Sequence, residues 1–160
     1  MKVTKNLIAY YLGTKSGDTT TFNLINKGFS SFEESPSAQV DEDQYIADKN
    51  GTSSVTGYKN SFAFEGAYVT DDPVCEAIYA VGRDQKTGSE AEFELVVVDL
   101  YETASPSGTY PARKMSVCCE VSGFPGKAGE KVSMSGSMHQ NGDLTQGTFV
   151  VNTKAFTAAS

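Results

Sequence analysis

Histidine, cysteine and tryptophan are scarce in this chain: its 160 residues include one histidine, three cysteines and no tryptophan. The number of cysteines is odd, and two of the three (Cys75, Cys118 and Cys119) are adjacent, so the sequence predicts no disulfide framework. This fits synthesis in a reducing cytoplasm. Cys118 and Cys119 fall in a strand-like segment, where neighbouring side chains face opposite ways and cannot chelate one metal ion together. The single histidine, His139, precedes an Asn-Gly turn, and there is no G-x-S-x-G motif. Without a nucleophile and a matching base, we predict that the protein is not an enzyme and needs no cofactor.

Long apolar runs and positive charge are also scarce. Even the longest apolar runs are short, for example Leu95–Val98, and stay far below the roughly 20 residues that cross a bilayer, so no membrane partner is expected. The apolar piece at residues 7–12 is too short for a secretory signal. Thirteen Lys and Arg against 20 Asp and Glu give a net charge of −7. That balance argues against a DNA-reading surface, which needs clustered cations, but a wall of negative charge lets DNA slide past without binding.

Two segments look like ligand-binding loops but lack residues that the phosphate-binding and calcium-binding motifs require. Residues 123–128 contain a Gly-Lys pair, but Val121 and Ala128 stand where a phosphate-binding loop needs glycine and Ser or Thr. The acidic run at residues 41–43 lacks the alternating oxygen ligands and the glycine of a calcium loop. We therefore predict no metal site and interpret the run as a solvated acidic loop.

The patterns that are present favour strands. Fifteen glycines and many Ser and Thr favour turns and strands over long helices. Residues 93–102 are apolar on both faces, which indicates a central, buried strand. Further strand-like segments are residues 22–25, 61–65, 115–121, 132–138 and 144–151, with polar turns at 14–20, 83–89 and 105–108 and a hairpin turn at Asn141-Gly142. Seven or eight strands without βαβ alternation predict a mainly β fold, an antiparallel sandwich or barrel flanked by one helix.

One helix is predicted over residues 72–82. Asp72 suits the N-cap and Pro73 suits the first helical position, which needs no N–H. Gly82 is expected to stop the helix. The expected core face, at helical spacing, is Val74, Ala77, Ile78 and Val81.

We expect a single domain over residues 1–160, because no repeat or linker-like composition divides it. Residues 1–12 read as an N-terminal arm with a strand, and residues 152–160 as a polar C-terminal tail. Residues 29–58 lack sustained periodicity and predict a long acidic loop. A loop of this length in a compact domain is usually functional or disordered.

The order of these features resembles that of the major tail proteins, or tail tube proteins, of long-tailed (siphovirus-type) phages. An acidic loop is followed by a Thr/Ser run with Gly57-Tyr58, an aromatic strand with Phe62 and Phe64, and the Asp-Pro helix start. A strand with a buried valine run and a Ser/Gly/Met hairpin follow. The resemblance is clearest over residues 44–81 and 93–102.

The resemblance implies a structural virion protein of the tail, synthesised in the host bacterial cytoplasm. Six copies would form a ring, and stacked rings would form a tube that conducts DNA during ejection. The implied partners are other copies of the chain, the tape measure protein, the tail terminator and tail tip proteins, and phage DNA in transit without sequence-specific binding. The tube protein of a contractile tail or of a secretion system is an alternative. A monomeric β-sandwich binding module on a virion surface is another, although the scattered tyrosines (Tyr10, Tyr11, Tyr58, Tyr68 and Tyr101) do not favour an aromatic groove.

The resemblance also suggests where assembly residues lie. Strand carboxylates are candidates for the lumen of the tube. Asp99 fits less well, because it lies on the same face of its strand as the apolar residues Phe93, Leu95 and Val97. The helix is expected to pack on the sheet and to help seal the subunit boundary. The lumen candidates are Glu65, Glu94, Asp99 and Glu102. The ring-stacking candidates, in and beside the long loop, are Glu33, Glu34, Asp41, Glu42, Asp43 and Tyr45.

Overall fold

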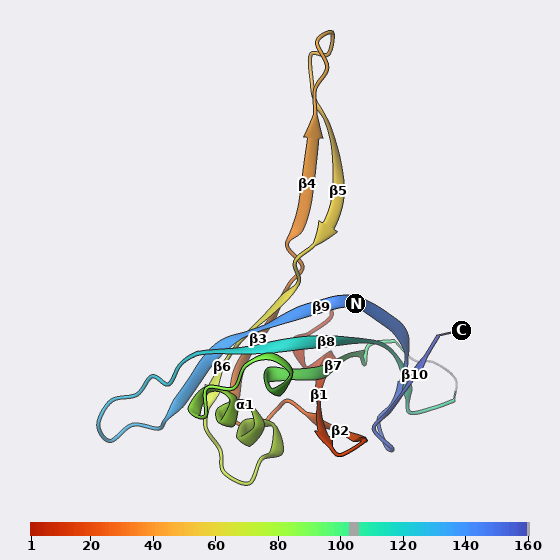
Figure 1. Cartoon of the computed structure of the whole chain (residues 1–160). Helices are drawn as coiled ribbons and strands as arrows, with labels where there is room; N and C mark the ends of the chain where they lie inside the picture. Colours follow the sequence, from red (N-terminus) through yellow and green to blue (C-terminus); the bar gives the residue numbers. More distant parts are fainter. Residues whose placement is uncertain (103–105, 160) are drawn as a thin grey trace.

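A computed structural model describes residues 1–102 and 106–159, and within them ten strands and one α-helix are formed. Eight strands form one antiparallel sheet in the order β2-β1-β7-β8-β9-β6-β3, with β10 attached to β9. The remaining two, β4 and β5, pair with each other and stand away from the sheet (Figure 1). The strands of the sheet are β1 (Ile8–Ser16), β2 (Thr19–Leu24), β3 (Phe29–Ser35), β6 (Ser61–Ala67), β7 (Glu92–Asp99), β8 (Thr109–Gly123), β9 (Ser133–Val150) and β10 (Ala155–Ala158).

Apolar cores lie on both faces of the sheet. On one face the sheet curls until its β6–β3 end reaches β1, where the Tyr10 and Phe32 rings lie 4.5 Å apart between centroids. On the other face the end of β9 folds back, and Phe149 packs 4.5 Å from the Tyr11 ring. The predicted mainly β fold, an antiparallel sandwich or barrel with one flanking helix, is confirmed.

The helix α1 (Pro73–Arg83) begins as its sequence predicts. The Asp72 carboxylate accepts a hydrogen bond from the backbone N–H of Val74 at 3.0 Å, and Pro73 occupies the first turn. Gly82 does not end the helix. It allows a close approach instead, because a Cβ there would lie 2.6 Å from the Phe124 ring.

The strand β7 lies between β1 and β8, and Val96, Val97 and Val98 are all buried on its two faces. The predicted central strand is therefore confirmed. The predicted end of this strand at residue 102 is wrong, because β7 stops at Asp99. Glu102 lies beyond the strand, and its N–H donates to the Asp99 carbonyl.

The prediction of one long loop over residues 29–58 is wrong. Residues 29–35 form β3, and β4 (Ala38–Asp43) and β5 (Thr52–Tyr58) form a hairpin. The sequence hides this hairpin because nearly all of its residues are exposed, so neither strand has a buried face to produce apolar alternation.

Two other expectations about turns are corrected. Asn141-Gly142 makes no hairpin turn, because β9 is continuous over 18 residues. The pairing shifts from Lys114 with Thr145 to Ser116 with Asn141, and Gly142, at φ 72°, lies in the resulting bulge. A dipeptide that tolerates positive φ suits a bulge as well as a turn. In the polar segment 14–20 the turn itself is confined to the residues around Gly17, and the rest of the segment belongs to β1 and β2.

The segment predicted as a polar C-terminal tail contains a short strand, since β10 pairs with β9 from Ala155 to Ala158. Ser105, in the predicted turn at 105–108, and Ser160, at the end of the predicted tail, lie outside the described residues. Two 3-10 turns, η1 (Lys5–Leu7) and η2 (Gly88–Ala91), precede β1 and β7. No helix in residues 1–102 and 106–159 has the length and apolar character to cross a membrane.

Candidate assembly surfaces

One face of β3, β6, β9 and β8 carries small or polar side chains, half of them serines, and no large apolar ones. Directly paired residues share a face of a sheet, so the register identifies its members: Glu33 pairs with Ala63, Ala63 with Ser137 and Ser137 with Glu120. We call this surface the serine face. Its residues are Ser31, Glu33, Ser35, Ser61, Ala63, Glu65, Ser133, Ser135, Ser137, His139, Cys118 and Glu120. None of these residues is buried, whereas Phe62, Met138 and Val117 on the opposite side lie in the core.

The serine face is weakly acidic. Three of the residues that define it are glutamates, and Lys and Arg are missing from that set. His139 Nε2 lies 2.7 Å from Glu120 Oε2, so the one imidazole of the face is held by a carboxylate. Binding a polyanion such as DNA requires clustered Lys and Arg side chains, and this set of residues does not provide them. The alternation of Ser133, Ser135 and Ser137 was visible in the sequence, but only the register places it beside Glu65 and Glu120.

The four lumen candidates do not share one surface. Glu65 lies on the serine face. Glu94 pairs with Ser116, and Ser116 with Asn141, so Glu94 projects from the same side of the sheet. Asp99 lies on the opposite side, because it shares the face of Leu95 and Val97, which belong to the core. Glu102 follows the end of β7. The structure therefore brings Glu65 and Glu94 to one side of the sheet and separates Asp99 and Glu102 from them.

Asp99 lies in a mixed charge environment. Burial raises the pKa of its carboxyl group, while the nearby Arg113 lowers it and the carboxylates of Glu102 and Glu34 raise it further. The net direction is upward. Asp99 is therefore a half-buried carboxyl that the fold holds at some cost, and it does not contribute to the serine face.

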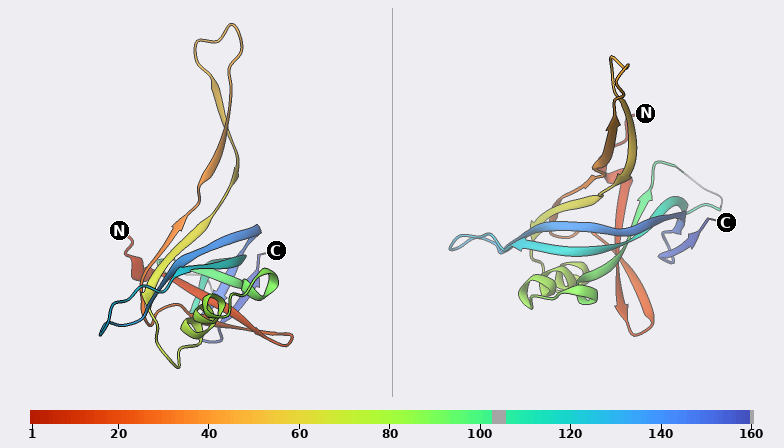
Figure 2. Two further views of the ribbon diagram at one scale, coloured as in Figure 1. Left: turned by 60° about the vertical axis from the view of Figure 1, so that its left-hand side comes forward. Right: turned by 45° about the horizontal axis from the view of Figure 1, so that its top comes forward.

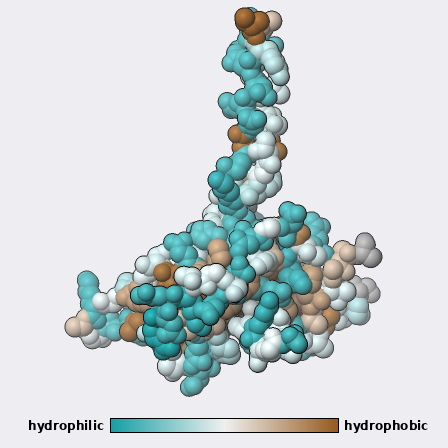
Figure 3. Space-filling model, viewed as in Figure 1, coloured by the Kyte–Doolittle hydropathy of each residue, from teal (hydrophilic) through white to brown (hydrophobic). Residues whose placement is uncertain are grey.

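The β4–β5 hairpin projects from the body and is exposed along its length (Figures 1 and 2). It continues the β3–β6 pair: Ser35 pairs with Ser61, and after a short gap Ala38 pairs with Tyr58. In the gap Ser37 has a φ of 50°, and its carbonyl accepts a hydrogen bond from the Lys59 N–H at 3.2 Å. Figure 3 shows apolar surface at the tip and midway along this otherwise hydrophilic hairpin.

The ring-stacking candidates divide between the hairpin and the body. Asp41, Glu42 and Asp43 lie on β4, and all are exposed. Tyr45 lies at the tip with 72% of its surface exposed. The other two candidates belong to β3, where Glu33 is on the serine face and Glu34 points inward.

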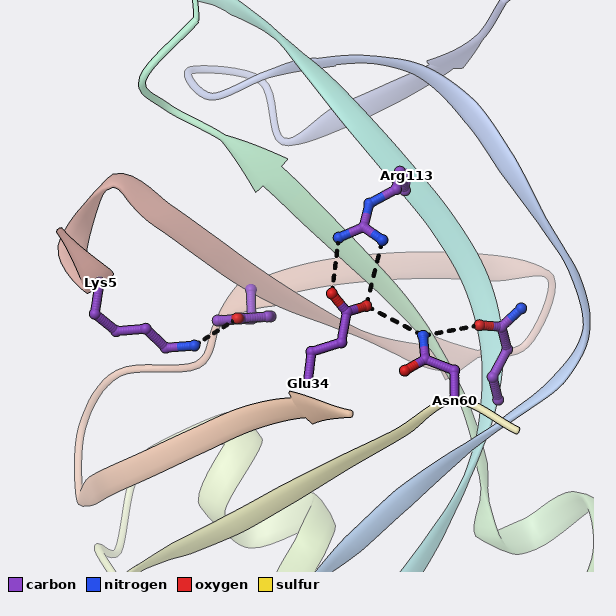
Figure 4. A network of polar contacts seen from close by, with 6 residues as sticks. Lys5, Glu34, Asn60 and Arg113 are labelled. Atoms are coloured by element: carbon purple, nitrogen blue, oxygen red, sulfur yellow. Dashed lines mark hydrogen bonds and ion pairs between the residues drawn. The ribbon is translucent and has the colours of Figure 1, made fainter. Parts of the chain in front are cut away.

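A polar network joins the base of the hairpin to the sheet (Figure 4). The Arg113 guanidinium donates to both oxygens of Glu34, at 3.2 and 3.3 Å. Asn60 Nδ2 donates to Glu34 Oε2 and to Gln140 Oε1, each at 3.1 Å. These residues line a cleft of about 530 Å³. No sequence signal identifies Arg113, because its partner Glu34 is 79 residues away in the chain.

The serine face ends at two strand edges. The strand β3 is at the end of the sheet order, and β8 beyond Cys118 pairs with β9 alone within the described chain. Unpaired strand edges present N–H and C=O groups that can join another chain. The helix lies on the opposite side of the sheet, where Val74, Cys75, Ile78 and Val81 are buried and Ala77 is half-buried.

The cysteines do not form a reactive or metal-binding group. Burial raises the pKa of Cys119 to about 12, so its thiol stays protonated at neutral pH. Cys75 is also buried, and burial raises its pKa. In the part of the chain that the structure describes, no three His, Cys, Asp or Glu residues are placed to hold a metal ion.

Comparison with known proteins relates the fold to chains of solved tail and baseplate structures. No protein-family model matches the chain, and no curated protein matches its sequence. Solved structures do. A chain of the SPP1 tail tube superposes with a TM-score of 0.69 at 11% identity, covering 91% of this chain and 78% of that one. A chain from the tail of the empty gene transfer agent particle, refined with C6 symmetry, has a TM-score of 0.57 at 15% identity and covers 99% and 100%.

A third similar chain comes from the sixfold-symmetrised baseplate of the anti-feeding prophage. Its TM-score is 0.53 at 9% identity, and the match covers 91% of this chain and 95% of that one. Identities this low establish a shared fold and nothing finer. The fold that the sequence resemblance implied, that of phage tail tube proteins, is thereby confirmed.

Proposed function

We propose that this chain is a non-enzymatic structural protein of a phage tail, whose copies form rings, with six copies in each, that stack into a tube. The serine face carries the proposal. It is a wide sheet surface of small or polar side chains, half of them serines, that lies outside both cores, and it ends at two unpaired strand edges. The fold shared with the SPP1 tail tube and the sixfold symmetry of two similar particles support the same conclusion.

Ring formation follows from the edges of the sheet. If β3 of one copy pairs with the free part of β8 on the next, the serine faces of neighbouring copies become one continuous surface. Closing such a sheet into a ring removes exposed edges, which otherwise invite aggregation. A head-to-tail interface of this kind closes when the rotation between copies allows it.

In this arrangement the serine face lines the lumen. Small side chains leave the channel unobstructed, and Glu33, Glu65 and Glu120 repel phosphates. DNA would then pass without being held. The tape measure, tail terminator and tail tip proteins are the expected partners of such a tube. A tube within a contractile tail or a secretion system would use the same surfaces.

Electron microscopy of the purified protein in negative stain, with its mass measured by light scattering, tests the assembly. We expect rings or tubes with a central hole at high protein concentration. A monomer that persists after addition of the tail tip and tape measure proteins would favour the rival binding module. The burial of Tyr10 and Tyr11 already removes two of the aromatics that such a module would need to expose.

Charge reversal tests the lumen. Glu65→Lys combined with Glu94→Lys places two cations on the side of the sheet that we assign to the lumen. We expect tubes of normal appearance and a loss of infectivity, because lysines retain DNA phosphates. Glu102→Lys, away from that side, is the matched control. Normal infectivity of the double variant would contradict the lumen assignment while leaving the tube intact.

A further inference from the structure

The tip of the β4–β5 hairpin is an ordered turn that displays two large side chains. Tyr45 is 72% exposed and Ile46 is fully exposed. The Asp48 N–H donates to the Tyr45 carbonyl at 2.9 Å, and the Tyr45 N–H donates to the Asp48 carboxylate at 3.2 Å. Gln44 Nε2 donates to the Asp48 carbonyl at 3.1 Å. The turn is therefore pre-organised, which lowers the entropy lost when it binds.

The partner of this tip must be another molecule. All three views show the hairpin pointing away from the sheet, so the tip does not reach the body of its own chain (Figures 1 and 2). The tip is also acidic on balance: Asp43 and Asp48 flank Tyr45 and Ile46, and residues 41–50 contain four Asp or Glu against one cation, Lys49. Its complement is an apolar surface with a cation at its rim.

The body carries such a surface where the sheet fails to close. A groove of about 430 Å³ lies between the beginning of β1 and the beginning of β3. Its walls are mainly apolar, and Lys5 is the charged residue among those that line it. Leu24 forms part of the wall and is 41% exposed. Lys5 Nζ donates one hydrogen bond, to the Tyr10 hydroxyl at 2.6 Å, and an ammonium group has three N–H donors (Figure 4).

The other large cleft of the body does not suit the tip. That cleft, at the base of the hairpin, is lined by Glu34, Arg113 and Asp143. Its one cation, Arg113, is already paired with Glu34, so the Asp143 carboxylate is left to repel Asp43 and Asp48. The groove beside Lys5 contributes no carboxylate among its described lining residues. In a chain of net charge −7, the groove beside Lys5 is therefore the one of these two clefts whose charge complements an acidic, apolar tip.

We propose that the Tyr45–Ile46 tip of one copy occupies the groove beside Lys5 on a second copy of the chain. The apolar side chains enter the groove, and the flanking carboxylates approach the Lys5 ammonium. The contact is heterologous, tip to groove, so each copy can give and receive it, and it propagates as an open stack. The inference rests on the proposed tube and names the surface that receives the hairpin.

Disulfide cross-linking tests the contact directly. A chain carrying Ile46→Cys and Leu24→Cys should give a ladder of covalent oligomers when assembled protein is oxidised. An equimolar mixture of the two single variants should give dimers only. Val132→Cys, at a residue 50% exposed and outside the groove, replaces Leu24→Cys in the control, and the wild-type chain corrects for Cys118. Tubes that cross-link through Val132→Cys and not through Leu24→Cys would overturn the contact and leave the tube standing.

Charge and polarity substitutions give a second readout that requires no cross-link. Ile46→Asp should abolish tube growth, whereas Ala47→Asp adds the same charge at the neighbouring exposed position and should permit it. Lys5→Glu should weaken assembly, and adding Asp43→Lys to that variant should restore it. Equal effects of Ile46→Asp and Ala47→Asp, without rescue by the charge swap, would reject the groove as the acceptor. A chain that never assembles would remove the proposed function and this contact with it.

Discussion

Among single residues, Ile78 gives the sharpest test of the packing. It has no exposed surface and lies on the face of α1 that contacts the sheet. Ile78→Asp places a charge in the core, and we expect a loss of at least about 3 kcal/mol in the free energy of unfolding. Chemical denaturation measures it. Ala77→Asp, at the half-buried neighbour, is the control and should cost clearly less; equal losses would mean that the buried face is misassigned.

Asp99 provides a pH-dependent prediction. Its pKa is raised in the folded state, chiefly by burial, so the folded protein binds the proton more tightly than the unfolded chain does. The ionised group therefore destabilises the fold at neutral pH, and stability falls as pH rises through the interval between the unfolded and folded pKa values. Asp99→Asn should raise the melting temperature at pH 7, by an amount worth less than about 1 kcal/mol because solvent screens the group.

The gain from Asp99→Asn should disappear below the ordinary carboxyl pKa of about 3.9, where the wild-type side chain is protonated in both states. Melting curves recorded across this range by calorimetry provide the check. A variant that is less stable at pH 7 would show that attraction to Arg113 outweighs the burial.

At the scale of elements, the hairpin depends on the network at its base. Glu34 and Arg113 are 21% and 30% exposed at their side chains, so the pair is only partly screened. A double-mutant cycle with Glu34→Gln and Arg113→Gln should give a coupling energy of about 1 kcal/mol. The more exposed pair Arg83 and Asp84, whose side chains are 60% and 46% exposed, is the control, and its cycle should show no measurable coupling. A vanishing coupling at Glu34 would mean that other contacts hold the hairpin base.

How far the sequence predicted each element depends on where its stabilising contacts lie. The helix was predicted to within a residue at each end, because the cap at Asp72, Pro73 and the apolar spacing are all local signals. The hairpin was missed because its strands bury almost nothing, and an exposed strand has no periodic signature. Asn141-Gly142 was misinterpreted because only pairing with β8 distinguishes a bulge from a turn. The serine face was visible as alternation in single strands, but which strands lie side by side is decided by contacts far apart in the chain.

For the whole molecule, the hairpin is separable from the fold. Its strands pair with each other and contribute nothing to either core. Replacing residues 39–57 by an Asn-Gly turn between Ala38 and Tyr58 should change the free energy of unfolding by no more than about 1 kcal/mol, since loop length affects stability weakly. The shortened protein should not stack into tubes. Denaturation and light scattering test the two halves of the prediction, and tubes of the shortened chain would exclude a stacking role for the hairpin.

The gap between the β3–β6 and β4–β5 ladders has a mechanical consequence. A strand ladder is stiff along its length because its backbone hydrogen bonds share the load, and the positive φ of Ser37 interrupts the ladder after Pro36. The β3–β6 pair and the β4–β5 hairpin that continues it are thus two stiff segments joined by a flexible hinge at residues 36–37 and 59–60. In a stack built from this chain, flexion would concentrate at these hinges. Such a tube would curve by small rotations between rings, while each ring kept its bore open.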